Sequence, residues 1–197
     1  MARIRGVTDR EAGRVARLAY RFSRSRFGEV AEPLTVTAHH PRLLLGYGAL
    51  ELAAERSKLV DGRLKELATI KVAAQVGCEF CIDIGSAIGR ESGISEEQLR
   101  GLPEYGESPA FSALEKLVVE YAEAMTRTPA EIPEPLFDAL RGHFDEAQLV
   151  ELTATIALEN YRARFNHAFG IGSQGFSGGA YCPLPEKAAS GAGGTGG

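Results

Sequence analysis

Apolar residues recur at spacings of three and four along most of the chain, the pattern of helices that bury one face. This pattern predicts helices over residues 10–27, 41–54, 64–76, 78–93, 95–98, 111–121 and 145–169, and a short one between 133 and 142. The strict alternation of apolar and polar residues that indicates strands is absent. We therefore expect an all-α fold, a compact helical bundle.

Several residues mark the ends of these predicted helices. Asp9 is a candidate N-cap for the first helix, and Gly28 is its expected stop. His40 and Pro41 open the second. Ser95 followed three residues later by Gln98 matches a capping box, in which each side chain bonds to the backbone N–H of the other residue.

The chain is expected to form one domain with a tail. It has 197 residues, of which 44% are hydrophobic and 24% charged, and these fractions suit a soluble globular protein with a core. No linker-like stretch divides residues 1–177, so we predict a single all-α domain there. Residues 178–197 are rich in Gly, Ser and Pro, which is typical of a flexible C-terminal tail.

Charge and hydropathy argue against two classes of partner. The formal net charge is −4, whereas affinity for nucleic acid comes mostly from Lys and Arg meeting phosphates. No apolar run approaches the roughly 20 residues that a membrane span needs. The N-terminus lacks the apolar region of a signal peptide, so we expect a cytoplasmic protein without nucleic-acid or membrane partners.

The most informative motif is Cys78-Glu79-Phe80-Cys81, which follows Gly77 where one helical pattern stops and another starts. In a cytoplasmic protein, C-x-x-C indicates a redox pair first. In the first turn of a helix both thiols share one face, and the exposed N–H groups favour a thiolate. On this argument Cys78, nearer the helix end, is the more acidic thiol. The alternative is a pair of inert, buried cysteines.

A zinc site is a second, weaker interpretation of the cysteine pair. Zinc needs two further ligands, and the candidates are Cys182, His39, His40, His143 and His167. None of these is paired at a recognised spacing, so we expect no metal and no cofactor. His39 and His40 are better explained as residues that cap the helix at Pro41 or pack against it.

Glu66 lies twelve residues before Cys78 on an otherwise apolar predicted helix. One interpretation is an exposed carboxylate paired with Lys65 or Lys71. The other is a buried acid whose raised pKa lets it move a proton to or from a cysteine sulfur. The sequence leaves both open.

The combination of Glu66 with Cys78-x-x-Cys81 resembles the alkylhydroperoxidase D-like / carboxymuconolactone decarboxylase family. Supporting strings are residues 39–41 before the second helix, 93–95 after the cysteine helix and 149–153 in the long one. The resemblance covers about residues 30–177. It implies an all-α homo-oligomer.

The resemblance also implies a thiol-dependent peroxidase. Cys81 would attack a hydroperoxide and become a sulfenic acid, Cys78 would condense with it to a disulfide, and an external thiol reductant would reopen the disulfide. Glu66 would serve the proton relay. The non-redox decarboxylases of the family lack the cysteine pair, so its presence argues against that lyase activity.

One departure from the family pattern affects the expected chemistry. The redox motif usually carries a histidine four residues after the second cysteine, and here that residue is Gly85. His167, near the end of the long helix, is our candidate to supply an imidazole. Without such a base, the alternative is a family member that binds a small apolar ligand or senses redox state.

Two further features receive no catalytic role. Residues 170–175 match the dinucleotide fingerprint G-x-G-x-x-G, but that motif must follow a strand and open a helix, whereas here it ends a long helix. We interpret it as a helix stop and turn. Cys182, the third cysteine, is expected to be an exposed spare thiol or a subunit contact. Arginines at helical spacing between residues 10 and 24 predict a solvated or subunit-contact face.

Overall fold

The computed structural model describes residues 2–178, and the predicted tail with Cys182 lies outside them. The elements are α1 (Arg14–Phe27), α2 (Glu32–Thr37), α3 (Pro41–Arg56), α4 (Gly62–Val76), α5 (Glu79–Glu91), α6 (Glu96–Gly101), the 3-10 helix η1 (Leu102–Glu104), α7 (Ala113–Thr126), α8 (Glu134–Arg141) and α9 (Glu146–Phe169). This part of the chain contains no strand. The predicted all-α class is confirmed.

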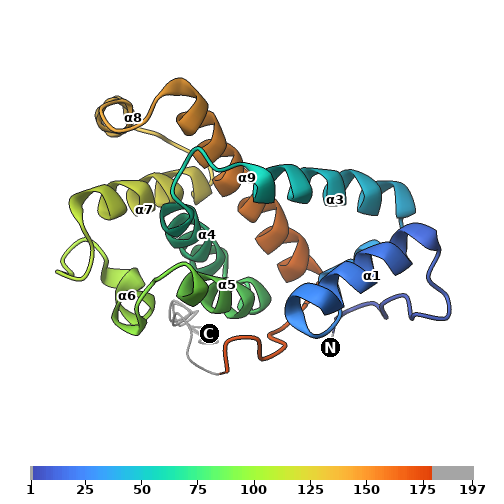
Figure 1. Cartoon of the computed structure of the whole chain (residues 1–197). Coiled ribbons are helices and arrows are strands. Elements are labelled where there is room, and N and C mark those ends of the chain that lie inside the picture. Colours follow the sequence, from blue (N-terminus) through green and yellow to red (C-terminus); the bar gives the residue numbers. More distant parts are fainter. Residues whose placement is uncertain (1, 179–197) are drawn as a thin grey trace, which may run out of the picture.

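Helix α4 is the centre of the bundle. It contacts α5, α7 and α9, and Figure 1 shows α7 and α5 beside it and α9 crossing it. Its residues Leu67, Ala68 and Ile70 have no exposed surface. A helix that is apolar on nearly all sides must be covered on nearly all sides, and α4 takes the buried central place for that reason.

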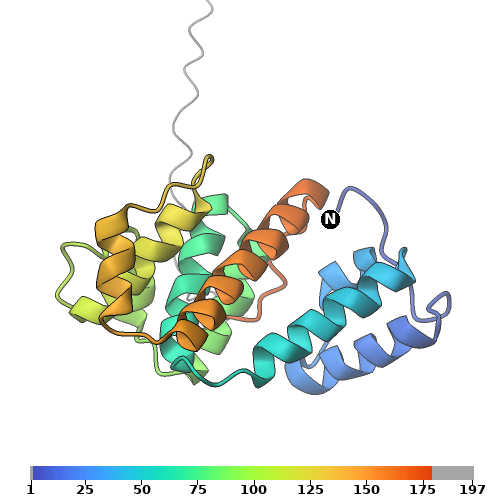
Figure 2. The ribbon, with the colours of Figure 1, turned by 90° about the horizontal axis from the view of Figure 1, so that it is seen from above.

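The first three helices form a separate layer on the far side of α9 from α7 and α8 (Figure 2). This layer has its own small core, which includes Tyr20 and Leu44. The Tyr20 hydroxyl donates a 2.8 Å hydrogen bond to the carbonyl of Val7 and ties the N-terminal segment to α1. Only Leu44 is buried on α3, although that helix is rich in leucine.

Most predicted helix ends are confirmed. Gly28 ends α1 in the left-handed conformation, with φ 83°, and Ser95 and Gln98 form the capping box of α6. The His40 ring accepts a hydrogen bond from the N–H of Leu43 at the start of α3.

One prediction about the N-terminal layer was wrong, and one of its helices was missed. Helix α1 begins at Arg14, with Gly13 as its N-cap, and the carboxylate of Asp9 instead pairs with Arg24. The backbone at residues 8–12 forms a turn whose Thr8 N–H donates to Glu11, so the chain is not helical there. Helix α2 was not predicted, because six residues carry too little periodicity.

None of the helices in the described part of the chain is both long and apolar enough to cross a bilayer.

Candidate functional site

The cysteine pair lies where α4 ends and α5 begins. Gly77 adopts a left-handed conformation, with φ 78° and ψ 35°, that a side chain would disfavour. The N–H groups of Gly77 and Cys78 donate to the Ala73 carbonyl, closing α4 in a Schellman-type turn. Cys78 then serves as the N-cap of α5, because its sulfur accepts a 3.2 Å hydrogen bond from the N–H of Cys81. The predicted start of this helix is confirmed.

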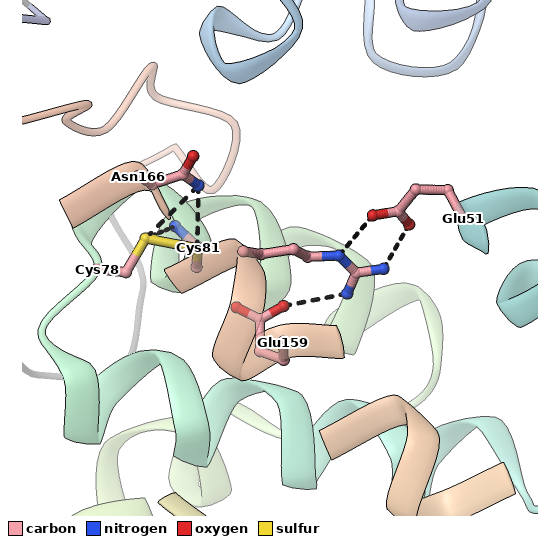
Figure 3. The surroundings of a disulfide bond; sticks show 6 residues. Glu51, Cys78, Cys81, Glu159 and Asn166 are labelled. Carbon is pink, nitrogen blue, oxygen red and sulfur yellow. Dashed lines mark hydrogen bonds and ion pairs between the residues drawn. A yellow bond between two sulfur atoms is a disulfide. The ribbon is translucent and has the colours of Figure 1, made fainter. Parts of the chain in front are cut away.

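Cys78 and Cys81 form a disulfide that is almost wholly buried (Figure 3). The two residues are 1% and 4% exposed. Asn166 of α9 points its side-chain amide at both sulfurs, with Nδ2 3.3 Å from Cys81 Sγ and 3.8 Å from Cys78 Sγ. Each sulfur therefore faces an N–H donor, the backbone amide for Cys78 and Asn166 for Cys81.

The position that carries the histidine in redox members of the family is closed by packing. Gly85 is buried in α5, and a Cβ built on it would lie 3.2 Å from Cγ1 of Ile70 on α4. Gly89, one turn later, is also tight against Ile70. Small residues at both positions bring α4 and α5 into close contact, so Ile70 fills the space beside Gly85.

Glu66 is half-buried on α4. Burial raises the pKa of its carboxyl above the usual value, while the positive charges of Arg162, Lys65 and Arg26 act in the opposite direction. The neighbouring Lys65 pairs instead with Glu151, at 2.5 Å, and Lys71 pairs with Glu123. Glu66 thus resembles the buried acid of our second interpretation more than an exposed, paired carboxylate.

A partly buried ionic cluster lies near Glu66. Arg162 of α9 donates to Glu51 of α3 through two nitrogens and to Glu159 of α9 at 3.1 Å (Figure 3). Burial, helped by the negative charges of Glu51 and Glu66, raises the pKa of Glu159 to about 7 against the opposing effect of Arg162. The sequence analysis missed this cluster, since its members come from two separated helices.

His167, the predicted site residue on α9, lies apart from the cysteines. His167 is exposed near the end of α9. Asn166, the preceding residue, points about 100° away around the helix and is the one that contacts the sulfurs. The signal for Asn166 was its position seven residues after Glu159, on the buried stripe of α9, where a polar side chain needs a partner.

The segment after α9 crosses α5 and is held there by Asp83. One or other carboxylate oxygen of Asp83 accepts hydrogen bonds from the Ser173 hydroxyl and from the N–H groups of residues 174–177, at 2.6–3.0 Å. Burial alone would raise the pKa of Asp83, but the hydrogen bonds from Ser177, Ser173 and Gly175 outweigh it and lower the pKa. The predicted stop and turn at 170–175 is confirmed, since Gly170 ends α9 with φ 65°.

This segment also covers the start of α5. The ring of Phe176 packs edge-to-face on Phe80, between the two cysteines, and on Phe27 of α1, with centroids 5.9 and 5.8 Å apart. Ile171 is 4% exposed and belongs to the same core cluster as the disulfide. The C-terminal strap, residues 171–177, therefore forms one wall of the site.

Within the part of the chain that the structure describes, His, Cys, Asp and Glu side chains do not gather in groups of three or more that could hold a metal ion. The chemistry at the sulfurs is that of the two cysteines and the amide of Asn166, and the acids with raised pKa values are the half-buried Glu66 of α4 and the buried Glu159 of α9.

Comparison with known sequences identifies relatives along most of the chain. The model of the carboxymuconolactone decarboxylase family matches residues 39–124. The uncharacterized protein YnjA of Escherichia coli (strain K12) is 37% identical over 166 residues, which are 83% of this chain and 88% of YnjA.

Solved structures share the fold at lower identity. The alkylhydroperoxidase AhpD core of an uncharacterized peroxidase-related protein from Ralstonia eutropha JMP134 superimposes with a TM-score of 0.80 at 17% identity, covering 89% of this chain and 94% of that one. The debrominase Bmp8 superimposes with a TM-score of 0.78 at 19% identity, with the same coverage. These likenesses establish the fold alone.

Proposed function

The chain belongs to the carboxymuconolactone decarboxylase family, and from this premise we propose that it is a thiol-dependent peroxidase acting through Cys78 and Cys81. The observation that carries the proposal is the pair itself. Two cysteines join across the first turn of α5, and an N–H donor meets each sulfur. Donors at this position stabilise a thiolate, which is the form that attacks a peroxide.

The reaction begins with the reduced pair. The Cys81 thiolate attacks one oxygen of a hydroperoxide, so that an S–O bond forms, the O–O bond breaks and an alkoxide leaves. The alkoxide takes a proton and becomes an alcohol. Cys78 then displaces water from the Cys81 sulfenic acid and gives the disulfide. An external dithiol reduces the disulfide by exchange and is itself oxidised.

Glu66 is the proposed proton carrier for these steps. Partial burial on α4 raises the pKa of Glu66 above the ordinary carboxyl value, which suits a group that accepts and returns a proton. The family resemblance assigns the relay to this position. The negative charge of Glu66 raises the pKa of Glu159. Protonation of Glu66 therefore affects the protonation of this second acid.

We also propose that the protein is a homo-oligomer with α3 in the subunit contact. Leu43, Leu45, Leu50 and Leu52 are each at least 40% exposed. At 100° per residue, Leu43 and Leu50 lie on one side of the helix, and Leu45 and Leu52 lie on the opposite side. Large apolar side chains exposed on two sides of one helix are typical of a protein contact. Light scattering after gel filtration should give a multiple of 21.1 kDa, and Leu45→Glu should shift the mass toward the monomer. A monomeric wild type would refute this part of the proposal.

The deciding experiment is peroxide consumption with a supplied dithiol, for wild type, Cys81→Ser and Cys78→Ser. Serine is a preferred N-cap residue, so Cys78→Ser keeps the cap of α5 while removing the thiol. Turnover lost in both variants supports the pair mechanism. No turnover in a wild type with reduced thiols would refute it.

A redox-sensing or small-ligand-binding protein is the second candidate. Two observations favour it, the packing of Ile70 against Gly85 where a base usually stands and the burial of both sulfurs. In that case the thiols should react slowly with alkylating agents below about pH 8, because neither thiol is activated. An enzyme should instead show one thiol that reacts rapidly near neutral pH.

A further inference from the structure

Asn166 is a polar side chain buried in an apolar part of the core. It is 3% exposed, and one turn before it on α9 lies Ala163, which has no exposed surface. The disulfide that it contacts belongs to an apolar core cluster that also includes Ala163. A buried amide costs free energy unless its N–H groups find acceptors, and the acceptors here are the two sulfurs (Figure 3).

The strength of these contacts depends on the redox state of the pair. A disulfide sulfur is a weak acceptor, whereas a thiolate carries a full negative charge and accepts a much stronger hydrogen bond. The Asn166 amide therefore interacts more favourably with the reduced, ionised pair than with the disulfide. Because Nδ2 is closer to Cys81 than to Cys78, the larger effect falls on Cys81.

We propose that Asn166 stabilises the Cys81 thiolate and so activates the nucleophile in a site whose usual histidine position is Gly85. The inference rests on the proposed thiol chemistry and adds a residue to it. In the first step the electron pair of the Cys81 thiolate forms the S–O bond as the O–O bond breaks. Asn166 gives up no proton and takes none, since its amide only donates a hydrogen bond to the charged sulfur.

An amide differs from an imidazole in one testable respect. Histidine changes charge near neutral pH, so the electrostatic stabilisation that it gives a thiolate changes with pH. Asn166 has no charge to lose, so its effect on Cys81 is the same from acidic to alkaline pH. The pH dependence of Cys81 reactivity should then be a single titration, that of the thiol itself.

The first test follows alkylation of Cys81 by iodoacetamide against pH in a Cys78→Ser background, with the modified peptide identified by mass spectrometry to separate it from Cys182. We expect a single titration below the ordinary thiol value of about 8.5. Asn166→Ala should raise the midpoint by about one to two pH units, as the loss of a hydrogen bond to a charged group does. Asn166→Asp, which has the same shape, should raise it further because two negative charges then meet.

The second test measures the reduction potential of the intact Cys78–Cys81 pair. Losing the donor removes more stabilisation from the reduced form than from the disulfide, so the potential should become more negative by about 30 mV for each tenfold change in the equilibrium constant. The matched control is Asn160→Ala. Asn160 is on the same helix, but its amide donates to Thr126 and to the Ile156 carbonyl, so neither readout should move.

Unchanged midpoints and potentials in folded Asn166→Ala and Asn166→Asp would overturn the inference. If neither variant folds, the single-cysteine protein with Asn166 intact decides, because a Cys81 midpoint at or above about 8.5 also overturns it. Failure of the proposed peroxidase is recognised separately. Shifted midpoints without peroxide turnover would uphold the role of Asn166 while refuting the enzyme, and turnover with unshifted midpoints would do the reverse.

Discussion

Glu159 and Arg162 form a 3.1 Å ion pair within α9, and the second carboxylate oxygen of Glu159 is buried without a hydrogen-bond partner in the described structure. Arg162 also forms an ion pair with Glu51 of α3, in the neighbouring layer. One guanidinium thus faces two carboxylates. In Glu159, the more buried of the two, only one carboxylate oxygen has a hydrogen-bond partner. Protonation of Glu159 relieves that situation, because a neutral carboxyl group is less costly to bury than a charged one.

This arrangement predicts how stability changes with pH. Burial raises the pKa of Glu159 from 4.5 to about 7, so between these two pH values the folded protein binds more protons than the unfolded chain. Stability from this group is therefore present at low pH and lost as pH rises through that window. Glu159→Gln should become more stable relative to wild type over the same window, by about 1.4 kcal/mol for each pH unit.

Urea unfolding at half-unit steps of pH checks this expectation. Glu120→Gln, at an exposed glutamate of α7, is the control and should follow the wild-type curve. A difference between Glu159→Gln and wild type that stays constant from pH 5 to pH 8 would contradict the assignment.

Asp83→Asn should detach the strap over α5. The amide that replaces the carboxylate has one acceptor oxygen instead of two and no charge, so it cannot hold the hydroxyl and the four backbone N–H groups that meet Asp83 now. We expect a loss of about 2–4 kcal/mol, typical of breaking a buried charged network. Hydrogen exchange should accelerate at residues 173–177.

The control for this variant is Glu97→Gln, at an exposed acid of α6, which should leave exchange at residues 173–177 unchanged. The lowered pKa of Asp83 means that its contribution is present at neutral pH and lost only as pH falls below about 4. Equal exchange in wild type and Asp83→Asn at pH 7 would show that the strap is held by its apolar contacts.

Gly85→Ala tests the packing that closes the position of the absent histidine. The new methyl group would lie 3.2 Å from Ile70, which is fully buried and cannot move freely. We expect destabilisation by about 1–3 kcal/mol, as for other overpacked cores. Gly46→Ala in α3 is the matched control. No atom lies within 4 Å of a Cβ there, so helix propensity should stabilise that variant by about 0.5–1 kcal/mol.

Thermal unfolding of both alanine variants gives the answer. If Gly85→Ala is as stable as Gly46→Ala, then space beside Ile70 is available and a histidine at this position was not excluded by packing.

Glu66→Gln tests the proposed proton carrier. It keeps the size of the side chain but cannot ionise, and removal of a general acid or base commonly costs at least about a hundredfold in rate. We expect kcat for peroxide to fall by that order and the limb of the pH–rate profile that reports Glu66 to disappear. An unchanged profile in a folded variant would exclude Glu66 from the reaction.

His167→Ala separates the exposed imidazole from its buried neighbour. His167 is exposed at the end of α9, whereas Asn166 meets the sulfurs. We therefore expect kcat/KM within about twofold of wild type, since an exposed side chain turned about 100° from the site has little to contribute. A loss of tenfold or more would restore the histidine to the mechanism.

The sequence by itself determined the elements and the pair of sulfurs. Helical periodicity, the glycine stop at Gly28, the capping box at Ser95 and the C-x-x-C after Gly77 all depend on neighbours within about one or two turns, and each is found as expected. Where the local signal was short or ambiguous, α2 was missed and the N-cap predicted at Asp9 was wrong.

The tertiary structure decided which side chains surround those sulfurs. Asn166 reaches Cys81 from 85 positions away along the chain, Asp83 gathers O–H and N–H donors from 90 to 94 positions away, and Arg162 joins two helices through Glu51. Such partners are set by how α3, α5 and α9 cross, and that depends on packing around α4. Spacing along the chain reports which residues share a helix face, whereas the environment of the sulfurs is fixed only when those faces meet.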